Sequence, residues 1–562
     1  MAPHNGRSTA GTSAYYGPCD IMVLMVNASV NKTVFVPPGL NRRAGDLRAE
    51  QVEAIRKALQ VRRAGYGLLL ADDMAMGKTL TSLSIAAVLQ VRRILVICPA
   101  IAKAHTWVPE IAKWFPGWRI LQIDGRNEAE LLWDNSETCV HVVNYDVLVN
   151  HLDALKRWVP QCVIIDESHY IKNVGYKPFK QTGRSKAITG SQRTWAALQI
   201  AEACRKAGGM VIAASGTPMV NRTAELIPQL KAIGALNPVF GSWRSFTETY
   251  CGGHYQKIRG KSIWIYDSST NGSQLNTKLL NSCMLRRTKQ QLMPDIQSAD
   301  PIYKPAPILD EEIMKDYRKA EQDIVAYMVE SATIKARNLG QNDRRAAIIA
   351  EFKANSAKSL VRLNVMREHI GRAKIPGVQQ FTDDLLTKGH SSMHILDQDA
   401  QDDQQPFKVI VFAHHRAIVQ QLAEYWNCPS IQGNQDQADR RDAVESFQHD
   451  DSVRVMVCSI QAAGVSIDLH KGAAAVFAEY HWSPAAHQQA IDRLCRPGRR
   501  GIAVPYFLYA PNSIDYVISQ LVGSKATKVD QAIDGRQHKD TADSQVREAV
   551  FGYLADKAID QG

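Results

Sequence analysis

Short apolar runs alternate with amphipathic helical stretches over two parts of the chain, from about residue 47 to 235 and from about residue 406 to 540. Each run is bounded by turn residues or followed by polar ones. Such runs are typical of strands that are buried on both faces of a parallel sheet. The predicted strands are Leu68–Leu70, Ile94–Ile97, Val140–Val143, Val163–Ile165 and Val211–Ala214, then Val409–Phe412, Val455–Cys458 and Ala474–Phe477.

The pattern predicts an α/β fold with two parallel-sheet lobes in tandem, at residues 45–235 and 406–540. Residues 236–405, between the lobes, have a different character. Within them Glu311–Lys374 is charged, rich in Ala, Lys, Arg and Glu, and helical in period, which predicts long helices and not a third sheet. The acidic stretch Asp397–Gln405 is typical of a linker or loop.

The two ends of the chain carry weaker patterns. Residues 1–44 form an N-terminal extension whose first dozen residues are rich in Gly, Ser and Ala, and we expect that part to be disordered. Two β-prone runs, Ile21–Val26 and Thr33–Val36, could pair as a hairpin ahead of the first lobe. Residues 541–562 are polar and carry no recognisable motif, so we expect a C-terminal tail there.

The composition narrows the class of protein. The chain has 562 residues, and 67 Lys and Arg against 56 Asp and Glu give a net charge of +11 with a pI of about 9.0. This surplus suits a polyanion, either nucleic acid or an acidic membrane surface, but it could also only keep a large protein soluble. The ten cysteines include no C-x-x-C pair, which argues against a zinc module and favours a reducing cytoplasm. No run approaches 18 apolar residues and no export signal is evident, so we expect a soluble, cytoplasmic protein.

The segment DDMAMGKT, at Asp72–Thr79, lies between a predicted strand and a predicted helix. In such a loop, backbone N–H groups and the helix N-terminus surround a phosphate. Gly77 allows close approach of the backbone, Lys78 would meet the β- and γ-phosphates, and Thr79 would offer its hydroxyl to Mg²⁺. Alone, the segment could be an ordinary helix start with a surface lysine, because Asp72 stands where the usual pattern begins with Gly.

An acidic pair, Asp166-Glu167, directly follows the predicted strand Val163–Ile165. Asp166 would hold Mg²⁺ through water, and Glu167 would orient or deprotonate the attacking water. Alone, such a pair is often only a charge that complements the dipole of a following helix. Its place one or two strand–helix units after a phosphate loop favours the catalytic interpretation.

Further motifs follow in the order of a known family. ADDMAMGKTLTSL, VIIDESHYIKN and ASGTPMVN resemble motifs I, II and III of the Swi/Snf-type family of superfamily-two helicase-like DNA translocases. In the second lobe, Lys408–Ala413, Ser459–Leu469 and Gln489–Arg496 resemble motifs IV, V and VI. Other blocks that resemble the family are Gln51, Cys98-Pro99, Asn144–Asp146, Asn221, Met284–Ile296, and Ile431–Gly433 with Asp439-Arg440. HWSPAAHQQAIDRLCRPGRR and REHIGRAKIPGV look closest to an annealing-helicase-like subgroup.

The resemblance, which covers about residues 47–520, implies two RecA-like lobes and a role for each matched residue. Lys78, Asp166 and Glu167 would be catalytic, with Arg493 and Arg496 reaching the γ-phosphate from the second lobe. We expect these two arginines one turn apart on a helix face, and a trans-acting arginine contributes roughly 10³–10⁵ in rate. ATP would be bound by Gln51, Asp72, Asp73, Met74, Ala75, Met76, Gly77, Lys78, Thr79 and Gly464, and Mg²⁺ by Thr79 and Asp166. Nucleic acid would be contacted by Pro99, Lys103, Asn144, Tyr145 and Ser459, and coupling would involve His169, Ser215, Thr217 and Gln489.

The motifs depart from the family pattern at four positions. Ala75 replaces a loop Gly, which costs only a methyl group if φ is negative there. Ser215 replaces a Thr and keeps the hydroxyl. Asp468 stands in place of an Asn and puts an acid near the phosphates, and Arg499 replaces a Gln. None of these changes removes a charge that hydrolysis needs.

The sequence therefore predicts an ATP-driven motor on nucleic acid, and the resemblance favours a monomeric translocase on double-stranded DNA that uses Mg²⁺. A strand-separating helicase on DNA or RNA is the alternative, and a nucleic-acid-binding scaffold with a decayed ATPase is a third hypothesis. Without recognisable chromatin-reading, nuclease or zinc modules, we expect a bacterial or phage protein. The pathway in which it acts does not follow from the sequence.

Overall fold

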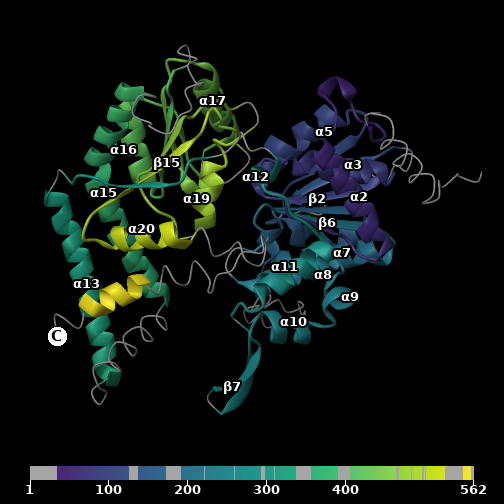
Figure 1. Ribbon diagram of the computed structural model, residues 1–562, viewed down its shortest axis with the longest axis horizontal. Coiled ribbons are helices and arrows are strands. Elements are labelled where there is room, and N and C mark those ends of the chain that lie inside the picture. Colours follow the sequence, from purple (N-terminus) through teal and green to yellow (C-terminus); the bar gives the residue numbers. More distant parts are fainter. Residues whose placement is uncertain are drawn as a thin grey trace, which may run out of the picture.

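The computed structural model consists of two α/β lobes that lie side by side, with the helices of the intervening segment around them (Figure 1). The structure describes residues 35–125, 137–172, 192–219, 222–258, 260–266, 268–292, 298–308, 311–336, 356–389, 406–433, 435–463, 467–482, 484–496, 499, 501–525 and 549–557. The predicted hairpin partner Ile21–Val26, together with Asn221 and Gly464, lies outside these residues.

Lobe 1 is built on a seven-stranded sheet in which every pair of neighbours is parallel. All five strands predicted for this lobe are present, and the sequence did not indicate β3 and β9. In spatial order the strands are β3 (Arg119–Ile123), β4 (Cys139–Asn144), β2 (Arg93–Cys98), β5 (Cys162–Asp166), β6 (Met210–Ala214), β1 (Leu68–Leu70) and β9 (Met284–Leu285).

Both faces of this sheet are buried. Successive side chains of each strand point to opposite faces, so alternate residues enter two different apolar cores. Leu95 and Ile97 enter one apolar core, whereas Ile94 and Val96 enter the other. This explains why the strands appear as continuous apolar runs. Lobe 1 contains α2 (Ala49–Arg63), α3 (Lys78–Val88), α4 (Ala100–Ala102), α5 (Val108–Trp114), α6 (Leu152–Trp158), α7 (Gln192–Lys206) and α8 (Leu226–Ala232).

Lobe 2 has a six-stranded sheet, also parallel throughout. The three predicted strands occupy its middle. In spatial order the strands are β10 (Ile302–Pro305), β15 (Val504–Tyr509), β14 (Ala474–Phe477), β11 (Val409–Ala413), β13 (Val455–Ser459) and β12 (Ser430–Ile431). Its helices are α16 (Arg416–Trp426), α17 (Gln437–His449), α18 (Ile460–Ala463), α19 (Pro484–Ile491) and α20 (Ile514–Lys525).

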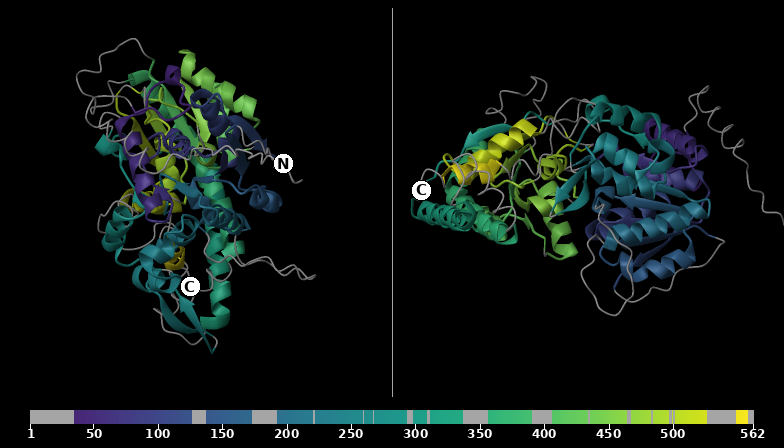
Figure 2. Two further views of the ribbon diagram at one scale, coloured as in Figure 1. Left: turned by 90° about the vertical axis from the view of Figure 1, so that its right-hand side faces the viewer. Right: turned by 90° about the horizontal axis from the view of Figure 1, so that it is seen from below.

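The segment between the lobes is mostly helical, as predicted. Two long helices, α13 (Glu311–Ala336) and α15 (Ser356–Lys388), flank lobe 2, and Figure 1 and the right-hand view of Figure 2 show them on the side away from lobe 1. The shorter helices are α9 (Leu236–Phe240), α10 (Trp243–Tyr250), α11 (Gly272–Asn281) and α12 (Lys289–Leu292). The segment also supplies an edge strand to each sheet, β9 and β10, so the two sheets reach beyond residues 45–235 and 406–540.

Two features of the described residues were not expected from the sequence. An antiparallel hairpin, β7 (His254–Ile258) and β8 (Lys261–Ile265), interrupts the helices of the intervening segment. Residues 549–557, within the expected polar tail, form a helix whose Lys557 bonds to Glu321 of α13 at 2.6 Å. Among the helices that the structure describes, none is long and apolar enough to span a membrane.

Candidate active site

The phosphate loop connects β1 to α3 at the carboxyl edge of the first sheet. Gly77 adopts a φ of 76°, which a glycine accepts at no steric cost, and α3 begins at the next residue. The Lys78 ammonium donates to the main-chain carbonyls of Asp72 and Asp73, at 2.9 Å each. Burial lowers the pKa of Lys78, against the opposing effect of the Glu167, Asp72 and Asp166 carboxylates. The loop thus encloses a desolvated ammonium, which suits a phosphate.

Ala75 departs from its expected geometry. Its φ is +65°, so the condition under which alanine would cost only a methyl group is not met. A left-handed backbone costs an L-residue roughly 1–2 kcal/mol that a glycine does not lose. The loop therefore keeps the shape that the family's glycine allows, with local strain.

The start of α2 bonds to the same loop. Gln51, predicted to read adenine, donates from Nε2 to the Gly77 carbonyl at 3.4 Å and accepts from the Arg48 backbone N–H at 3.0 Å. The Arg48 guanidinium donates to the Met76 carbonyl at 2.6 Å. Sequence reasoning missed Arg48, although it lies only three residues before Gln51. The α2 terminus is thereby fixed beside the nucleotide loop.

Two arginines that follow β9 hold the acidic start of the loop. Asp72 is almost fully buried and accepts a bidentate pair of bonds from Arg287, Nε to Oδ1 at 3.1 Å and Nη2 to Oδ2 at 2.5 Å. Arg286 forms an ion pair with Asp73 at 2.7 Å and donates to the carbonyls of Ala71 and Gly216. These two arginines belong to the block Met284–Ile296, which resembles the family. Their contact with the phosphate loop depends on β9 lying beside β1, which the sequence does not indicate.

Asp166, the predicted Mg²⁺ residue, ends β5 near Lys78. Its Oδ2 accepts a hydrogen bond from the buried Trp107 indole at 2.8 Å, and its main-chain carbonyl accepts one from the Tyr145 hydroxyl at 2.5 Å. Burial and the Glu167 charge raise the pKa of Asp166 to about 6, and the Trp107 bond opposes them. Trp107 ends a π-helical turn, Lys103–Trp107, a feature often found at functional sites. Sequence reasoning did not single out this tryptophan.

Glu167 is joined to motif III by hydrogen bonds, and the coupling role of these residues stays a prediction. Its Oε2 accepts a hydrogen bond from Ser215 Oγ at 3.1 Å and lies 3.3 Å from His169 Nδ1. Ser215 Oγ also lies 3.0 Å from His169 and accepts from the Thr217 backbone N–H at 3.1 Å. Burial acts to raise the pKa of Glu167, but His169, Lys78 and Arg493 lower it to about 2, so it is an anion near neutral pH.

The predicted nucleic-acid contacts in lobe 1 are not displayed on the surface. Pro99, Lys103, Asn144 and Tyr145 are all buried. Lys103 donates to the Ile123 carbonyl at 3.1 Å and to Asn144 at 3.4 Å, and it forms an ion pair with Asp124. In this structure Lys103 and Tyr145 support the sheet edge and Asp166, and the contact of these four residues with nucleic acid stays a prediction. Ser459, at the end of β13, is half-buried.

One of the two motif VI arginines, Arg493, lies close enough to lobe 1 for its charge to interact with Glu167. The prediction that Arg493 and Arg496 share one helix face is wrong. Helix α19 ends at Ile491, and the two arginines lie in the turns that follow. Burial and the neighbouring Arg496 lower the pKa of Arg493 to about 9, and Glu167 of lobe 1 acts against them. Asp492 forms an ion pair with Lys289 at 2.8 Å.

Further residues of the second lobe surround this turn. Gln489 is half-buried on α19. Asp468, which replaces the family's Asn, accepts from His470 and lies close enough to Arg496 for that charge to help lower its pKa, against the effect of burial. Arg499, the other replacement in this lobe, donates to the Gly472 carbonyl at 2.5 Å. The Asp468 carboxylate therefore lies beside the motif VI arginine Arg496 on lobe 2, whereas the phosphate loop lies on lobe 1.

The donor set fits a magnesium nucleotide. A threonine hydroxyl, two carboxylates and a buried ammonium converge at one sheet edge, and oxygen donors are the ligands that Mg²⁺ prefers. A Cβ on Gly216 would lie 2.8 Å from Met74 Cγ and 3.5 Å from Lys78 Nζ, so motif III packs directly on the loop.

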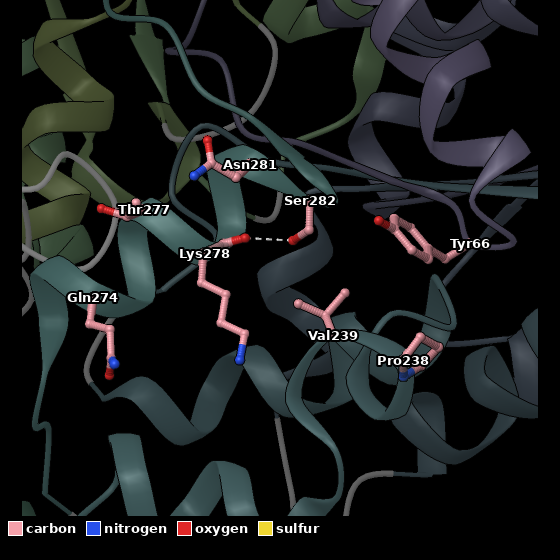
Figure 3. Close-up of a pocket in the computed structure, with 8 residues that line it drawn as sticks. All are labelled: Tyr66, Pro238, Val239, Gln274, Thr277, Lys278, Asn281 and Ser282. Atoms are coloured by element: carbon pink, nitrogen blue, oxygen red, sulfur yellow. Dashed lines mark hydrogen bonds between the residues drawn. The ribbon is translucent and has the colours of Figure 1, made fainter.

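A separate surface hollow of about 630 Å³ lies between α9 and α11 (Figure 3). Its lining carries one charged group, the Lys278 ammonium, and includes none of the predicted site residues. The hollow therefore has no part in the active site.

Two family descriptions match this chain. Residues 50–193 match the SNF2-related domain, and residues 391–498 match the helicase conserved C-terminal domain. The chain is 27% identical over 466 residues to the SWI/SNF-related matrix-associated actin-dependent regulator of chromatin subfamily A-like protein 1 homolog of Caenorhabditis elegans, covering 82% of this chain and 58% of the relative. It is 26% identical over 502 residues to the mouse DNA annealing helicase and endonuclease ZRANB3, covering 86% and 41%. This chain thus spans about half the length of these relatives.

A solved structure, a Sulfolobus solfataricus SWI2/SNF2 ATPase core in complex with dsDNA, aligns over 88% of this chain and 93% of that one. Its identity is 20% and its TM-score 0.37, too low to support a conclusion. The resemblance to annealing helicases is confirmed by the curated relatives. They come from animals and do not test the predicted bacterial or phage source.

Proposed function

We propose that this chain, which belongs to the SNF2-related family of superfamily-two helicase-like proteins, hydrolyses ATP between its two lobes and thereby moves along double-stranded DNA. The observation that carries the proposal is the meeting of two lobes at one site. Lys78, Asp166 and Glu167 lie on lobe 1, and Arg493 of lobe 2 interacts electrostatically with Glu167.

Each side chain has a defined task in hydrolysis. Lys78, released from the loop carbonyls, would pair with the β- and γ-phosphates. Thr79 and Asp166 would hold Mg²⁺, which supplies charge neutralisation and orientation of the phosphates when bound. Glu167, already an anion, would orient the attacking water, and Arg493 would stabilise charge on the transferred phosphoryl group.

The coupling of hydrolysis to motion follows from the same contacts. Loss of the γ-phosphate removes the group that Lys78 and Arg493 both attract, so the closed arrangement of the lobes loses stability. The bonds that join Glu167, Ser215 and His169 would transmit that change to motif III and the loop it packs against. If both lobes hold DNA by its phosphates, opening and closing moves the protein along it.

The choice of duplex DNA rests on the relatives and on charge. One relative is named a DNA annealing helicase, and the net charge of +11 suits a polyanion. Contacts to phosphate and sugar imply little sequence specificity and strong salt dependence. The domain limits, a monomeric state and a cytoplasmic location stay predictions.

The testing experiment is steady-state ATP turnover with and without a duplex, using wild type, Lys78→Ala and, as control, Lys113→Ala on α5. We expect duplex-stimulated turnover that only Lys78→Ala abolishes. Equal turnover in wild type and Lys78→Ala would refute the ATPase. Stimulation by RNA alone would refute the DNA assignment, and separation of a forked duplex without displacement of a third strand would favour the unwinding alternative.

A further inference from the structure

The β7–β8 hairpin projects from lobe 1 beyond α10, away from both sheets (Figure 1). Its strands pair antiparallel, with Tyr255 opposite Trp264 and Lys257 opposite Ser262. An isolated two-stranded hairpin is marginally stable in water, so a hairpin that projects needs support at its base.

That support comes from α10. The Trp264 ring lies 3.3 Å from the Arg244 guanidinium, and its indole N–H donates to Thr247 Oγ1 at 3.2 Å. Arg244 also donates to the Tyr255 hydroxyl at 3.3 Å. A Cβ on Gly253 would lie 2.3 Å from the Trp264 ring, so the chain enters the hairpin in close contact with it. These contacts hold the base of the hairpin in one orientation. The hairpin would therefore lose less conformational entropy when it binds a partner.

The outer part of the hairpin is open to solvent. Tyr255 is 62% exposed although its hydroxyl is bonded, and Ile263, on the opposite face, is 42% exposed. His254, Gln256 and Lys257 are exposed as well. Described side chains on both faces of the hairpin are therefore exposed to solvent beyond its contacts with α10, and its role is not to fill a core.

The chemistry of this surface is basic and aromatic. The sequence of residues 254–266, HYQKIRGKSIWIY, contains Lys257, Arg259 and Lys261 and no Asp or Glu. A lysine without an acidic neighbour on the same hairpin is available to an external anion. A two-stranded β-ribbon also fits the major groove of B-DNA, and an exposed aromatic ring can stack on a base or pack on a sugar.

We propose that the β7–β8 hairpin is a DNA-binding element outside the cleft between the lobes, with Lys257 on a phosphate and Tyr255 against the sugar or base. This inference rests on the proposed function for its ligand. Charge complementarity favours a nucleic acid over an apolar protein partner, because Lys257 and Ser262, the pair nearest the tip whose side chains the structure describes, are basic and polar.

Binding of a fluorescent 40-base-pair duplex at several salt concentrations tests the proposal. Lys257→Glu should weaken binding about tenfold at 0.1 M salt and reduce the slope of log K against log salt by about 1. Lys206→Glu on α7, which changes the net charge equally at a lysine 75% exposed, should leave the slope unchanged. Turnover of ATP at saturating duplex should stay at the wild-type value in both variants.

A photo-cross-linking benzoylphenylalanine at position 255 should also attach to the duplex. Equal affinity and slope in the two lysine variants, or no cross-link from position 255, would overturn the hairpin proposal. The proposed function would still hold in that case if the duplex stimulates ATP turnover. Wild-type ATP turnover that does not change when the duplex is added would overturn the proposed function, and the DNA assignment of the hairpin with it.

Discussion

The Asp72–Arg287 pair links the phosphate loop to the end of the intervening segment, and its loss should be costly. The Asp72 side chain is 3% exposed and that of Arg287 10%. Arg287→Met would leave a buried carboxylate without its bidentate partner, which costs about 3–5 kcal/mol. Asp72→Asn should cost less, about 1–3 kcal/mol, because the guanidinium keeps the Glu50 carbonyl and the Glu53 carboxylate.

The double variant Asp72→Asn/Arg287→Met removes both charges. Its destabilisation should fall short of the sum of the single values by about 1 kcal/mol or more, since neither charge remains buried alone. Urea titration read by hydrogen exchange of peptides from β1 and β5 reports lobe 1 separately from lobe 2. The exposed pair Lys206–Glu202, in the same lobe, supplies the control, and Lys206→Met should cost less than about 1 kcal/mol. Additivity within about 0.5 kcal/mol would refute the reasoning.

Three further substitutions have defined outcomes. Ala75→Gly should stabilise lobe 1 by about 1 kcal/mol and keep ATP turnover, because φ is +65°; lower stability in urea would contradict this. Trp107→Phe, which removes the bond to Asp166, should raise the Mg²⁺ concentration for half-maximal turnover more than the KM for ATP, and an unchanged Mg²⁺ requirement would argue against a positioning role. His141, whose ring nitrogens lack hydrogen-bond partners among the described residues, has its pKa lowered to about 4 by burial. Below about pH 6.5 this histidine therefore binds a proton in the unfolded chain but not in the folded one, so the free energy of unfolding falls. Between pH 7.5 and 5 wild type should lose about 2 kcal/mol of stability through this group, and His141→Phe should not. Urea titrations at both pH values, with exposed His449→Gln as control, check this, and equal pH dependence in wild type and His141→Phe would contradict it.

The central strands of both sheets could be predicted because each is buried on both faces and so forms an apolar run. Most of the strands that the sequence did not indicate lack that signal. β15 (VPYFLY) is the exception, because it is buried at its first five positions and was still missed; its Pro505 is untypical of a strand inside a sheet. β3 (RILQI) has polar positions at a sheet edge, and β9 and β12 have two residues each. The β7–β8 hairpin has exposed positions on both faces, so no period separates it from a loop.

The residues of the candidate site also differ in whether the sequence alone could identify them. Lys78, Asp166 and Glu167 were found because each chemical task demands a residue type at a fixed place after a strand. The Asp72–Arg287 pair joins residues 215 positions apart and depends on β9 lying beside β1. The positive φ of Ala75 and the burial of Tyr145 are consequences of tertiary packing, which a single sequence does not display.

Single-turnover hydrolysis by Arg493→Ala tests the central claim, that the two lobes form one catalytic site, most directly. Because the phosphate loop lies wholly on lobe 1, the variant should bind a fluorescent ATP analogue with an affinity within about threefold of wild type. Hydrolysis should fall by roughly 10³ or more, the usual contribution of a trans-acting arginine. Arg441→Ala, at an arginine 70% exposed on α17, should hydrolyse ATP like wild type. Retention of hydrolysis within tenfold in Arg493→Ala would show that lobe 1 acts alone and would contradict the account.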